Sequence, residues 1–331
     1  MAVPVALTNM MPQTVCIVGA GLIGRAWSVV FARAGWRVRL HDADPVALER
    51  AVPWVGEALA AEEKVGLLDA GMRTRAAAAL SSHADLDDAL AGVDWVQECG
   101  PEIVEAKAQL FARFDRATSP SAVLASSTSA IVASRFTEAL KGRARCLVAH
   151  PVNPPHLVPV VELCGSPWTS PETMERARSV MASLGQVPVT VRHEIDGFVL
   201  NRLQGALLSE AMRLVGDGVI SPEDLDATMH AGLGCRWSFM GPFATIELNA
   251  PGGVADYAAR YAAFYRRLAT DPPGPHVWDE DYARRVGAAL GPAATDAQRQ
   301  ALTAWRDERL LALRAHQRTQ PLAQRKELDE R

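Results

Sequence analysis

Short apolar runs alternate with amphipathic stretches along the first 192 residues. Several of these runs are apolar at nearly every position, which is typical of parallel strands that are covered on both faces. The predicted strands are TVCIVG (14–19), WRVRLHD (36–42), DWVQECG (94–100), AVLASST (122–128), RCLVAHP (145–151), VPVVELC (158–164) and VPVTVR (187–192). Helical spacing between them, at 22–34, 44–64, 103–118 and 171–184, predicts an α/β fold with a doubly wound, mostly parallel sheet.

The strand pattern stops after Arg192, and helical spacing takes over. DGFVLNRLQGALLSEAMRLVGDG places apolar residues on one helical face, and SPEDLDATMHAG opens with a Ser–Pro helix start. Further helical stretches run through 254–268, 279–289 and 294–316, and QPLAQRKELDER reads as a solvated tail. The pattern therefore predicts two domains, an α/β domain at 1–192 and an all-α domain at 193–331.

A glycine motif follows the first predicted strand. TVCIVGAGLIGRAW places Gly19, Gly21 and Gly24 between a strand and a helix, and Asp42 ends the next strand eighteen residues after Gly24. The glycines allow a tight turn and a close approach to a pyrophosphate, which the helix amino terminus favours. An acidic residue at the position of Asp42 binds the adenosine ribose and disfavours the extra phosphate of NADP. The motif predicts a Rossmann-type domain that binds NAD.

A proline-rich segment, HPVNPPHLVPVVE (150–162), carries the candidate acid/base chemistry. Oxidation of an alcohol by NAD requires a base for the hydroxyl proton. His150 lies at the end of one predicted strand and Glu162 at the end of VPVVE, so the stiff connection between them could bring imidazole and carboxylate together. A purely structural histidine is the alternative. Asn153 is expected near the nicotinamide or the substrate, whereas His156 and His193 have no obvious carboxylate partner.

Further polar residues follow other predicted strands. SSTSA (126–130) offers hydroxyls at the same sheet edge, or it simply caps the helix that follows. Asn201 lies early in the first helix of the second domain, where it faces either the cleft or water. Gln97, Glu98, Glu102 and Lys107 form an acidic cluster, for which a solvated helix start is the competing interpretation.

Composition excludes several classes of partner. The formal charge of −4 and a pI of about 6.1 argue against nucleic acid and anionic membranes. The apolar runs are too short to cross a bilayer, the amino terminus lacks a secretory signal, and the five scattered cysteines suggest reduced thiols in the cytoplasm. No cluster of metal-ligating residues is apparent, so we expect no metal. A small-molecule substrate remains the expected partner.

Taken together, these motifs resemble the 3-hydroxyacyl-CoA dehydrogenase superfamily. GAGLIG, SSTSA, HPVNPP…VVE and GFVLNRLQ occur in the order and approximate spacing of that family, over about 14–250. The resemblance implies that His150 is the acid/base, that Glu162 orients it, and that Ser129 and Asn201 hold substrate oxygens. It also implies a homodimer and a set of NAD contacts, namely Gly19, Gly21, Leu22, Ile23, Gly24, Asp42, Glu102, Lys107, Ser127 and Asn153.

Within the superfamily, the chain looks most like the λ-crystallin / L-gulonate 3-dehydrogenase branch. HPVNPPHLVPVVEL, GFVLNRLQGALLSEAMRLV, SPEDLDATMHAGLGCRW and FMGPF support this placement. Arg236 could bind the carboxylate of a free 3-hydroxy acid, because a thioester presents no anion there. The expected reaction is therefore oxidation of a free 3-hydroxy acid, with L-gulonate as the lead substrate.

Other substrates stay open. The helical region 54–80 mixes basic and acidic residues and offers no clear platform for the phosphates of CoA, which disfavours a 3-hydroxyacyl-CoA without excluding it. L-Carnitine would need an aromatic wall, to which Trp237 and Phe239 could contribute. A non-enzymatic, crystallin-like role predicts decay of the catalytic set, yet all four of its members are present: Ser129, His150, Glu162 and Asn201.

Overall fold

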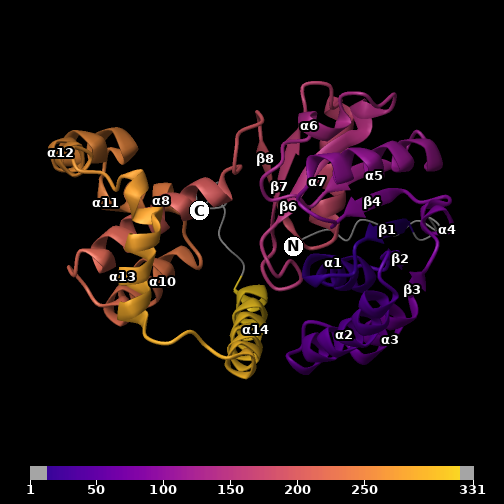
Figure 1. Cartoon of the computed structure of the whole chain (residues 1–331), viewed down its shortest axis with the longest axis horizontal. Coiled ribbons are helices and arrows are strands. Elements are labelled where there is room, and N and C mark those ends of the chain that lie inside the picture. The colour runs from indigo at the N-terminus through magenta and orange to yellow at the C-terminus, as the bar shows by residue number, and fades with distance from the viewer. Residues whose placement is uncertain (1–12, 321–331) are drawn as a thin grey trace. The chain divides into compact units, whose positions relative to one another are not determined.

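The computed structural model describes residues 13–320, which separate into two compact units (Figure 1). The first unit contains the described residues up to Asn201 together with Ala304–Gln320, and the second contains Arg202–Thr303. The expected absence of a secretory signal and the expected solvated tail concern residues that lie mostly outside the described part of the chain. Each unit is built around its own set of secondary-structure elements.

The first unit is built on one eight-stranded sheet with the order β3-β2-β1-β4-β5-β6-β7-β8. Neighbouring strands are parallel except β6 and β7, which are antiparallel. This arrangement confirms the doubly wound, mostly parallel fold. The strands are β1 (Thr14–Val18), β2 (Arg37–His41), β3 (Leu80–His83), β4 (Trp95–Glu98), β5 (Val123–Ser126), β6 (Cys146–Pro151), β7 (Val160–Gly165) and β8 (Val187–Val191).

The sequence pattern missed β3. This strand reads LSSH, and its two serines are exposed. A strand at the edge of a sheet pairs on one side only, so it does not need the continuous apolar run that identifies a central strand.

Helices cover both faces of the sheet. Successive residues of β1 point to opposite sides, so Val15 and Ile17 enter one core while Cys16 and Val18 enter the other. The first core also contains residues of α1 (Leu22–Arg33), α2 (Pro45–Lys64) and α7 (Pro171–Ser183), and α3 (Ala70–Ala78) packs on it. The second core contains residues of α4 (Leu86–Leu90), α5 (Val104–Ala117) and α6 (Ser134–Thr137). Burial on both faces explains why the central strands are apolar at almost every position.

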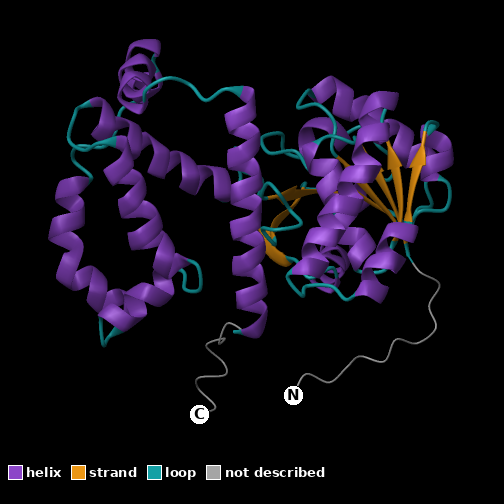
Figure 2. Cartoon of the chain, turned by 90° about the horizontal axis from the view of Figure 1, so that it is seen from below, coloured by secondary structure: helices purple, strands orange, loops and turns teal. Residues whose placement is uncertain are grey.

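The second unit is helical, as the sequence predicts, and Figure 2 shows strands only in the first unit of the described chain. The predicted helix start at Ser221 is confirmed, because its side chain accepts a hydrogen bond from Asp224 N at 3.1 Å. The helical elements that follow β8 along the chain are α8 (Leu200–Gly216), α9 (Pro222–Ala227), a π-helical turn (Thr228–Leu233), α10 (Gly234–Trp237), α11 (Pro242–Asn249), α12 (Gly253–Leu268), α13 (Glu280–Leu290) and α14 (Asp296–Thr319). Short 3-10 turns occur at Arg143–Arg145 in the first unit and Pro275–Trp278 in the second.

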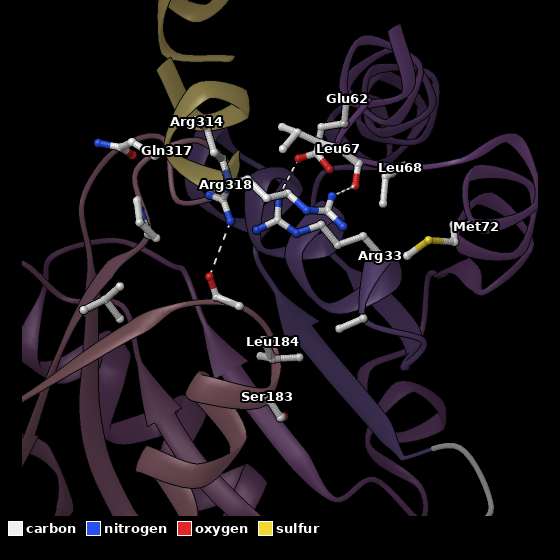
Figure 3. Close-up of a pocket in the computed structure, with 14 residues that line it drawn as sticks. Arg33, Glu62, Leu67, Leu68, Met72, Ser183, Leu184, Arg314, Gln317 and Arg318 are labelled. Carbon is white, nitrogen blue, oxygen red and sulfur yellow. Dashed lines mark hydrogen bonds and ion pairs between the residues drawn. The ribbon is translucent and has the colours of Figure 1, made fainter. Parts of the chain in front are cut away.

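The final helix, α14, is divided between the two units. Leu311 packs with Leu67 and Leu157 of the first unit, which explains why residues 304–320 belong there. Arg314 and Arg318 of this segment line a pocket of the first unit, together with Arg33 of α1 (Figure 3). Within residues 13–320, no helix is both long and apolar enough to cross a bilayer.

Candidate active site at the carboxyl ends of the parallel strands

The glycine loop connects β1 to α1, and its three glycines meet different constraints. Gly19 has φ +107°, and a Cβ there would lie 2.6 Å from the Cys99 carbonyl oxygen. A Cβ on Gly24 would lie 1.7 Å from the Gly19 carbonyl oxygen, so only glycine allows the helix to begin so close to the loop. Gly21 is the residue before α1, and a Cβ there would meet no atom within 4 Å. The loop is therefore closely packed at Gly19 and Gly24 and open at Gly21.

The opening beside Gly21 suits an anionic ligand. No side chain caps the amino terminus of α1 and no acidic residue occupies its first turn, so its N–H groups and positive dipole end are available. Asp42 follows β2, and its Oδ2 accepts a hydrogen bond from Ala20 N at 2.6 Å. The carboxylate therefore lies against the glycine loop. Leu22 begins α1 and is 62% exposed, whereas Ile23 packs partly against the first core.

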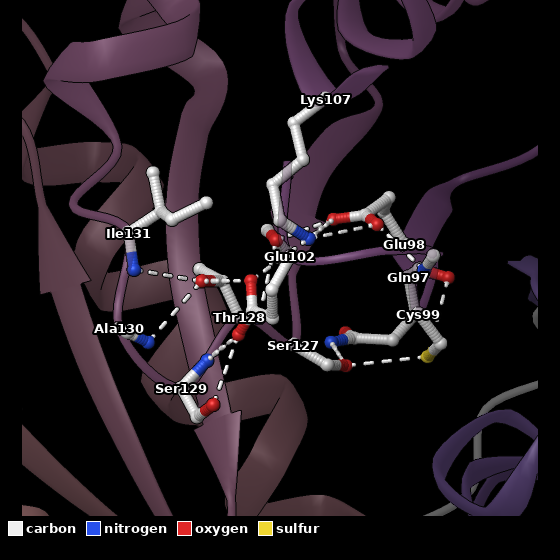
Figure 4. A network of polar contacts seen from close by, with 12 residues as sticks. Gln97, Glu98, Cys99, Glu102, Lys107, Ser127, Thr128, Ser129, Ala130 and Ile131 are labelled. Atoms are coloured by element: carbon white, nitrogen blue, oxygen red, sulfur yellow. Dashed lines mark hydrogen bonds and ion pairs between the residues drawn. The ribbon is translucent and has the colours of Figure 1, made fainter. Parts of the chain in front are cut away.

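A buried ion pair lies behind the ends of β4 and β5 (Figure 4). Glu98 is the last residue of β4, and both of its oxygens are 3.0 Å from Nζ of Lys107. Ser126, the last residue of β5, donates to Glu98 Oε2, and Gly100 N donates to Oε1. Glu98 and Lys107 are 0% and 1% exposed. The interpretation of this cluster as a solvated helix start is wrong for these two residues, because each is the charge partner that allows the other to be buried.

Glu102 ties the SSTSA loop to the start of α5. Its Oε1 accepts hydrogen bonds from Ser129 N at 2.5 Å and Ser129 Oγ at 2.9 Å, and its Oε2 accepts one from Thr128 Oγ1 at 2.7 Å. Burial alone would raise the pKa of Glu102, but these bonds and the charge of Lys107 outweigh it and lower the pKa. Glu102 is therefore held ionised, and Lys107 lies too deep to reach a ligand except through it.

The hydroxyl of Ser127 contacts three side chains of the first unit. Its hydroxyl accepts hydrogen bonds from Trp27 Nε1 at 3.1 Å and Gln97 Nε2 at 2.7 Å, and it lies 3.3 Å from Cys99 Sγ. Its backbone N–H donates to Glu98 O at 2.7 Å. These contacts fix the path of the loop that leaves β5.

His150 and Glu162 are direct cross-strand partners on β6 and β7. The distance from His150 Nδ1 to Glu162 Oε2 is 2.9 Å, and the two residues are 5% and 3% exposed. The expectation that Glu162 ends its strand is wrong. It lies near the beginning of β7, and the pairing arises because β7 runs antiparallel to β6 and returns alongside it.

Glu162 is also held by the amino terminus of α8. Its Oε1 accepts hydrogen bonds from Val199 N at 2.9 Å and Leu200 N at 3.0 Å. Burial would raise the pKa of Glu162, yet hydrogen bonds from His150 and from these two N–H groups outweigh burial and lower it. The carboxylate is thus ionised at neutral pH, and its position orients His150 with Nδ1–H toward Glu162 and Nε2 away from it.

Sequence reasoning did not identify the turn that aims these N–H groups. Gly197 and Phe198 both have positive φ, +74° and +47°, and a bulky residue rarely adopts this conformation. Phe198 is fully buried, and its ring centroid is 5.5 Å from that of His150. Burial of the ring compensates for the backbone strain, and the turn points two N–H groups at Glu162. A glycine followed by an aromatic residue before a helix was the one signal available.

The other predicted residues lie in different settings. Asn201 Nδ2 donates to the backbone oxygen of Ser129 at 2.8 Å, which joins the start of α8 to the SSTSA loop. Asn153 is exposed in the loop between β6 and β7, and His193 is exposed as well. His156 is buried, and burial together with nearby arginines lowers its pKa to about 3. Arg236 and Trp237 belong to α10 of the second unit, where Trp237 is 42% exposed.

Both halves of the chain are similar in sequence to known proteins. Residues 14–195 match the NAD-binding domain of 3-hydroxyacyl-CoA dehydrogenase, and residues 197–285 match the C-terminal domain of the same family. The chain is 43% identical to Lambda-crystallin of Oryctolagus cuniculus over 255 residues, which are 77% of this chain and 80% of that protein. It is 34% identical to L-carnitine dehydrogenase of Pseudomonas putida over 305 residues, 91% and 92% of the two chains.

A solved structure extends the likeness to three dimensions. The crystal structure of 5-formyl-3-hydroxy-2-methylpyridine 4-carboxylic acid 5-dehydrogenase, described as an NAD+ dependent dismutase, is similar with a TM-score of 0.77 and 31% identity. The match covers 92% of this chain and 98% of that one, so it includes both units.

Proposed function

The chain belongs to the 3-hydroxyacyl-CoA dehydrogenase family, and from this membership we propose that it oxidises the 3-hydroxyl of a free 3-hydroxy acid to a 3-oxo acid. The family makes it an NAD-dependent dehydrogenase. L-Gulonate is the lead substrate. The observation that carries the proposal is the buried contact between His150 and Glu162.

His150 is assigned as the general base. With Nδ1–H directed at Glu162, the lone pair on Nε2 can accept the proton of the substrate hydroxyl. The imidazolium that forms is stabilised by the ionised carboxylate beside it. Bases of this kind accelerate reactions by about 10²- to 10⁴-fold. Ser129 and Asn201 are assigned to the substrate oxygens, and the hydrogen bond from Asn201 Nδ2 to the Ser129 backbone oxygen, which keeps the two residues adjacent, supports a joint role.

The glycine loop fits NAD. Gly19, Gly21 and Gly24 would hold the pyrophosphate at the uncapped start of α1, and Asp42 would bind the adenosine ribose. When bound, NAD supplies the acceptor for the hydride. Leu22 is exposed at the loop, and Glu102 is held ionised beside the SSTSA loop, so both can contribute contacts. The remaining proposed contacts are Ile23, Ser127 and Asn153, and the buried Lys107 would act through Glu102.

Arg236 is assigned to the carboxylate of the substrate, because a guanidinium binds a carboxylate through two parallel hydrogen bonds. A 3-hydroxyacyl-CoA, such as 3-hydroxybutyryl-CoA, is the alternative that the family name supports. L-Carnitine is a further alternative, favoured by the likeness to L-carnitine dehydrogenase and by the exposed ring of Trp237. A non-enzymatic role is disfavoured because the residues of the proposed site are present together.

NAD reduction measured with L-gulonate, 3-hydroxybutyrate, 3-hydroxybutyryl-CoA and L-carnitine tests these assignments. We expect the highest kcat/KM with L-gulonate, and we expect Arg236→Ala to raise KM for free acids while KM for NAD is unchanged. An unchanged KM for every free acid would remove Arg236 from substrate binding. Exclusive turnover of the CoA ester would replace the free acid by the thioester.

We further propose that the protein forms a homodimer through its helical unit. Large apolar side chains are exposed there, including Leu203 at 67%, Phe243 at 71% and Leu248 at 74%. Exposed apolar surface on this scale is typical of an interface. Sedimentation of the intact protein tests the proposal, and a monomer at micromolar concentration would contradict it. A cytoplasmic location is likewise proposed, and cell fractionation would test it.

A further inference from the structure

A pocket of about 670 Å³ lies at the end of α1 that is opposite the glycine loop. Leu22 begins this helix and Arg33 ends it, so the two residues are about 16 Å apart along the helix axis. None of the residues assigned to NAD or to acid/base chemistry lines the pocket. The proposed function therefore leaves it unexplained.

The lining of the pocket combines positive charge with apolar surface. Arg33 comes from α1, and Arg314 and Arg318 come from the last part of α14; Figure 3 shows them turned toward one another from two sides. Apolar side chains complete the lining, among them Leu67, Leu68, Met72, Leu184 and Val187. A ligand that fits these walls has a charged head and an apolar body.

The charge in the pocket is not balanced. Arg33 Nη1 lies 2.5 Å from Glu62 Oε1, the one carboxylate among the lining residues. Arg314 Nη1 donates instead to the His156 carbonyl oxygen at 2.9 Å, and Arg318 Nη1 donates to the Leu67 carbonyl oxygen at 2.6 Å. Carbonyl oxygens accept hydrogen bonds without cancelling a net charge. Three guanidinium groups therefore face one carboxylate.

Arg33 gives the main evidence that the pocket suits an anion. Its side chain is only 9% exposed, and its Nη2 is buried without a hydrogen-bond partner among the described residues. An unpaired buried donor is costly, and an anionic oxygen is the acceptor that satisfies it best. Burial, followed by the neighbouring charges of Arg33 and Arg318, also lowers the pKa of Arg314 to about 10. Water therefore solvates Arg33 and Arg314 poorly.

We propose that this pocket binds an amphipathic organic anion, of which an aliphatic carboxylate is the simplest example. The head would pair with Arg33, Arg314 and Arg318, because guanidinium groups match carboxylates bidentately. The body would cover Leu67, Met72 and the neighbouring apolar side chains. Because the arginines belong to α1 and α14, the ligand would bind these two helices to each other and stabilise the first unit.

Hexanoate is a suitable probe for calorimetric titration and thermal unfolding of the full-length protein. We expect hexanoate to bind and to raise Tm, and we expect hexan-1-ol, which has no charge, to do neither. Acetate and inorganic phosphate, which have no apolar body, should bind more weakly than hexanoate. Equal effects of hexanoate and hexan-1-ol, or binding of phosphate alone, would overturn the assignment of the ligand class.

Substitutions locate the site. Arg314→Gln and Arg318→Gln should each weaken hexanoate binding about tenfold, whereas Arg309→Gln, on an exposed part of the same helix, should leave it unchanged. Arg318 is exposed, so its variant is expected to fold even if Arg314→Gln does not. Unweakened binding in Arg318→Gln would refute the proposal. NADH binding is expected to persist in these variants, so a failure here stays separate from a failure of the proposed dehydrogenase function.

Discussion

Replacing Glu162 by glutamine removes a negative charge next to the candidate base. The carboxylate is 3% exposed, and its Oε2 lies 2.9 Å from Nδ1 of His150. Glutamine has nearly the same shape, and its oxygen can still accept hydrogen bonds from Val199 N and Leu200 N. We expect the variant to fold. The change therefore isolates the charge rather than the packing.

The size of the effect follows from the short distance and the burial. Two unit charges about 4 Å apart interact by about 4 kcal/mol at an effective dielectric constant of about 20. The imidazolium appears only when His150 takes a proton, so most of this energy is lost from the transition state. Each loss of about 1.4 kcal/mol is tenfold in rate, and a loss of about 3–4 kcal/mol predicts a kcat that is about 100- to 1,000-fold lower. The amide N–H also favours the wrong tautomer of His150, which acts in the same direction.

The assay is steady-state NAD reduction with L-gulonate, or with whichever substrate proves active, across pH. Glu162→Gln should lower kcat and change its pH dependence, while NADH affinity and Tm stay close to those of the wild type. Glu162→Asp should restore part of the rate, because it returns the charge at a longer distance. Glu175→Gln, which neutralises an exposed carboxylate on α7, serves as the matched control. A kcat for Glu162→Gln within about threefold of the wild type would refute the electrostatic argument.

Three further predictions concern the cofactor loop, the buried ion pair and acid stability. Gly24→Ala should abolish NADH binding in fluorescence titrations and lower Tm, because the new Cβ would lie 1.7 Å from a carbonyl oxygen. Gly21→Ala should keep the wild-type Tm, because no atom lies within 4 Å of its new Cβ. Equal Tm values for the two variants would contradict this reasoning. Lys107→Met should lower the free energy of unfolding by about 3–5 kcal/mol, because it leaves the buried Glu98 without its charge partner. Adding Glu98→Gln should recover part of this loss in urea titrations. No recovery would mean that the loss comes from altered packing rather than from the unpaired charge. The pKa of Glu102 is below its usual 4.5 in the folded state, so the folded state binds fewer protons and stability is lost as pH falls below about 4.5. Glu102→Gln should flatten this dependence in unfolding measured between about pH 5 and pH 3, and an unchanged slope would assign the acid sensitivity to other carboxylates.

Local chemistry made the glycine loop between β1 and α1 predictable. Gly19, Gly21 and Gly24 stand at fixed offsets after an apolar run, and Asp42 follows the next run. In the structure the glycines form the connection between β1 and α1, and Asp42 accepts a hydrogen bond from Ala20 in that connection, because the strand, the loop and the helix are consecutive in sequence. Short-range geometry of this kind requires no knowledge of distant contacts.

Long-range pairing was harder to predict. The sequence suggested that the prolines between His150 and Glu162 bring the two side chains together, but not that β7 is antiparallel to β6 and sets them in direct register. It also gave no reason to bury Glu98 and Lys107, because the charge that compensates each lies nine residues away in the chain. A charged residue is predicted to lie in solvent unless the opposite charge that pairs with it is known.

The sequence by itself determined the class of the fold, the cofactor and the likeness to a dehydrogenase family, since these depend on apolar periodicity and on motifs that span a few residues. Only the tertiary structure decided how Glu162 is held, because Val199 and Leu200 reach it through a strained turn at Phe198. Only the tertiary structure showed that the end of α14 belongs to the first unit. Only there do arginines from two helices that are distant in sequence line one pocket. Burial and charge balance are properties of groups brought together from distant parts of the chain, and a linear pattern does not contain them.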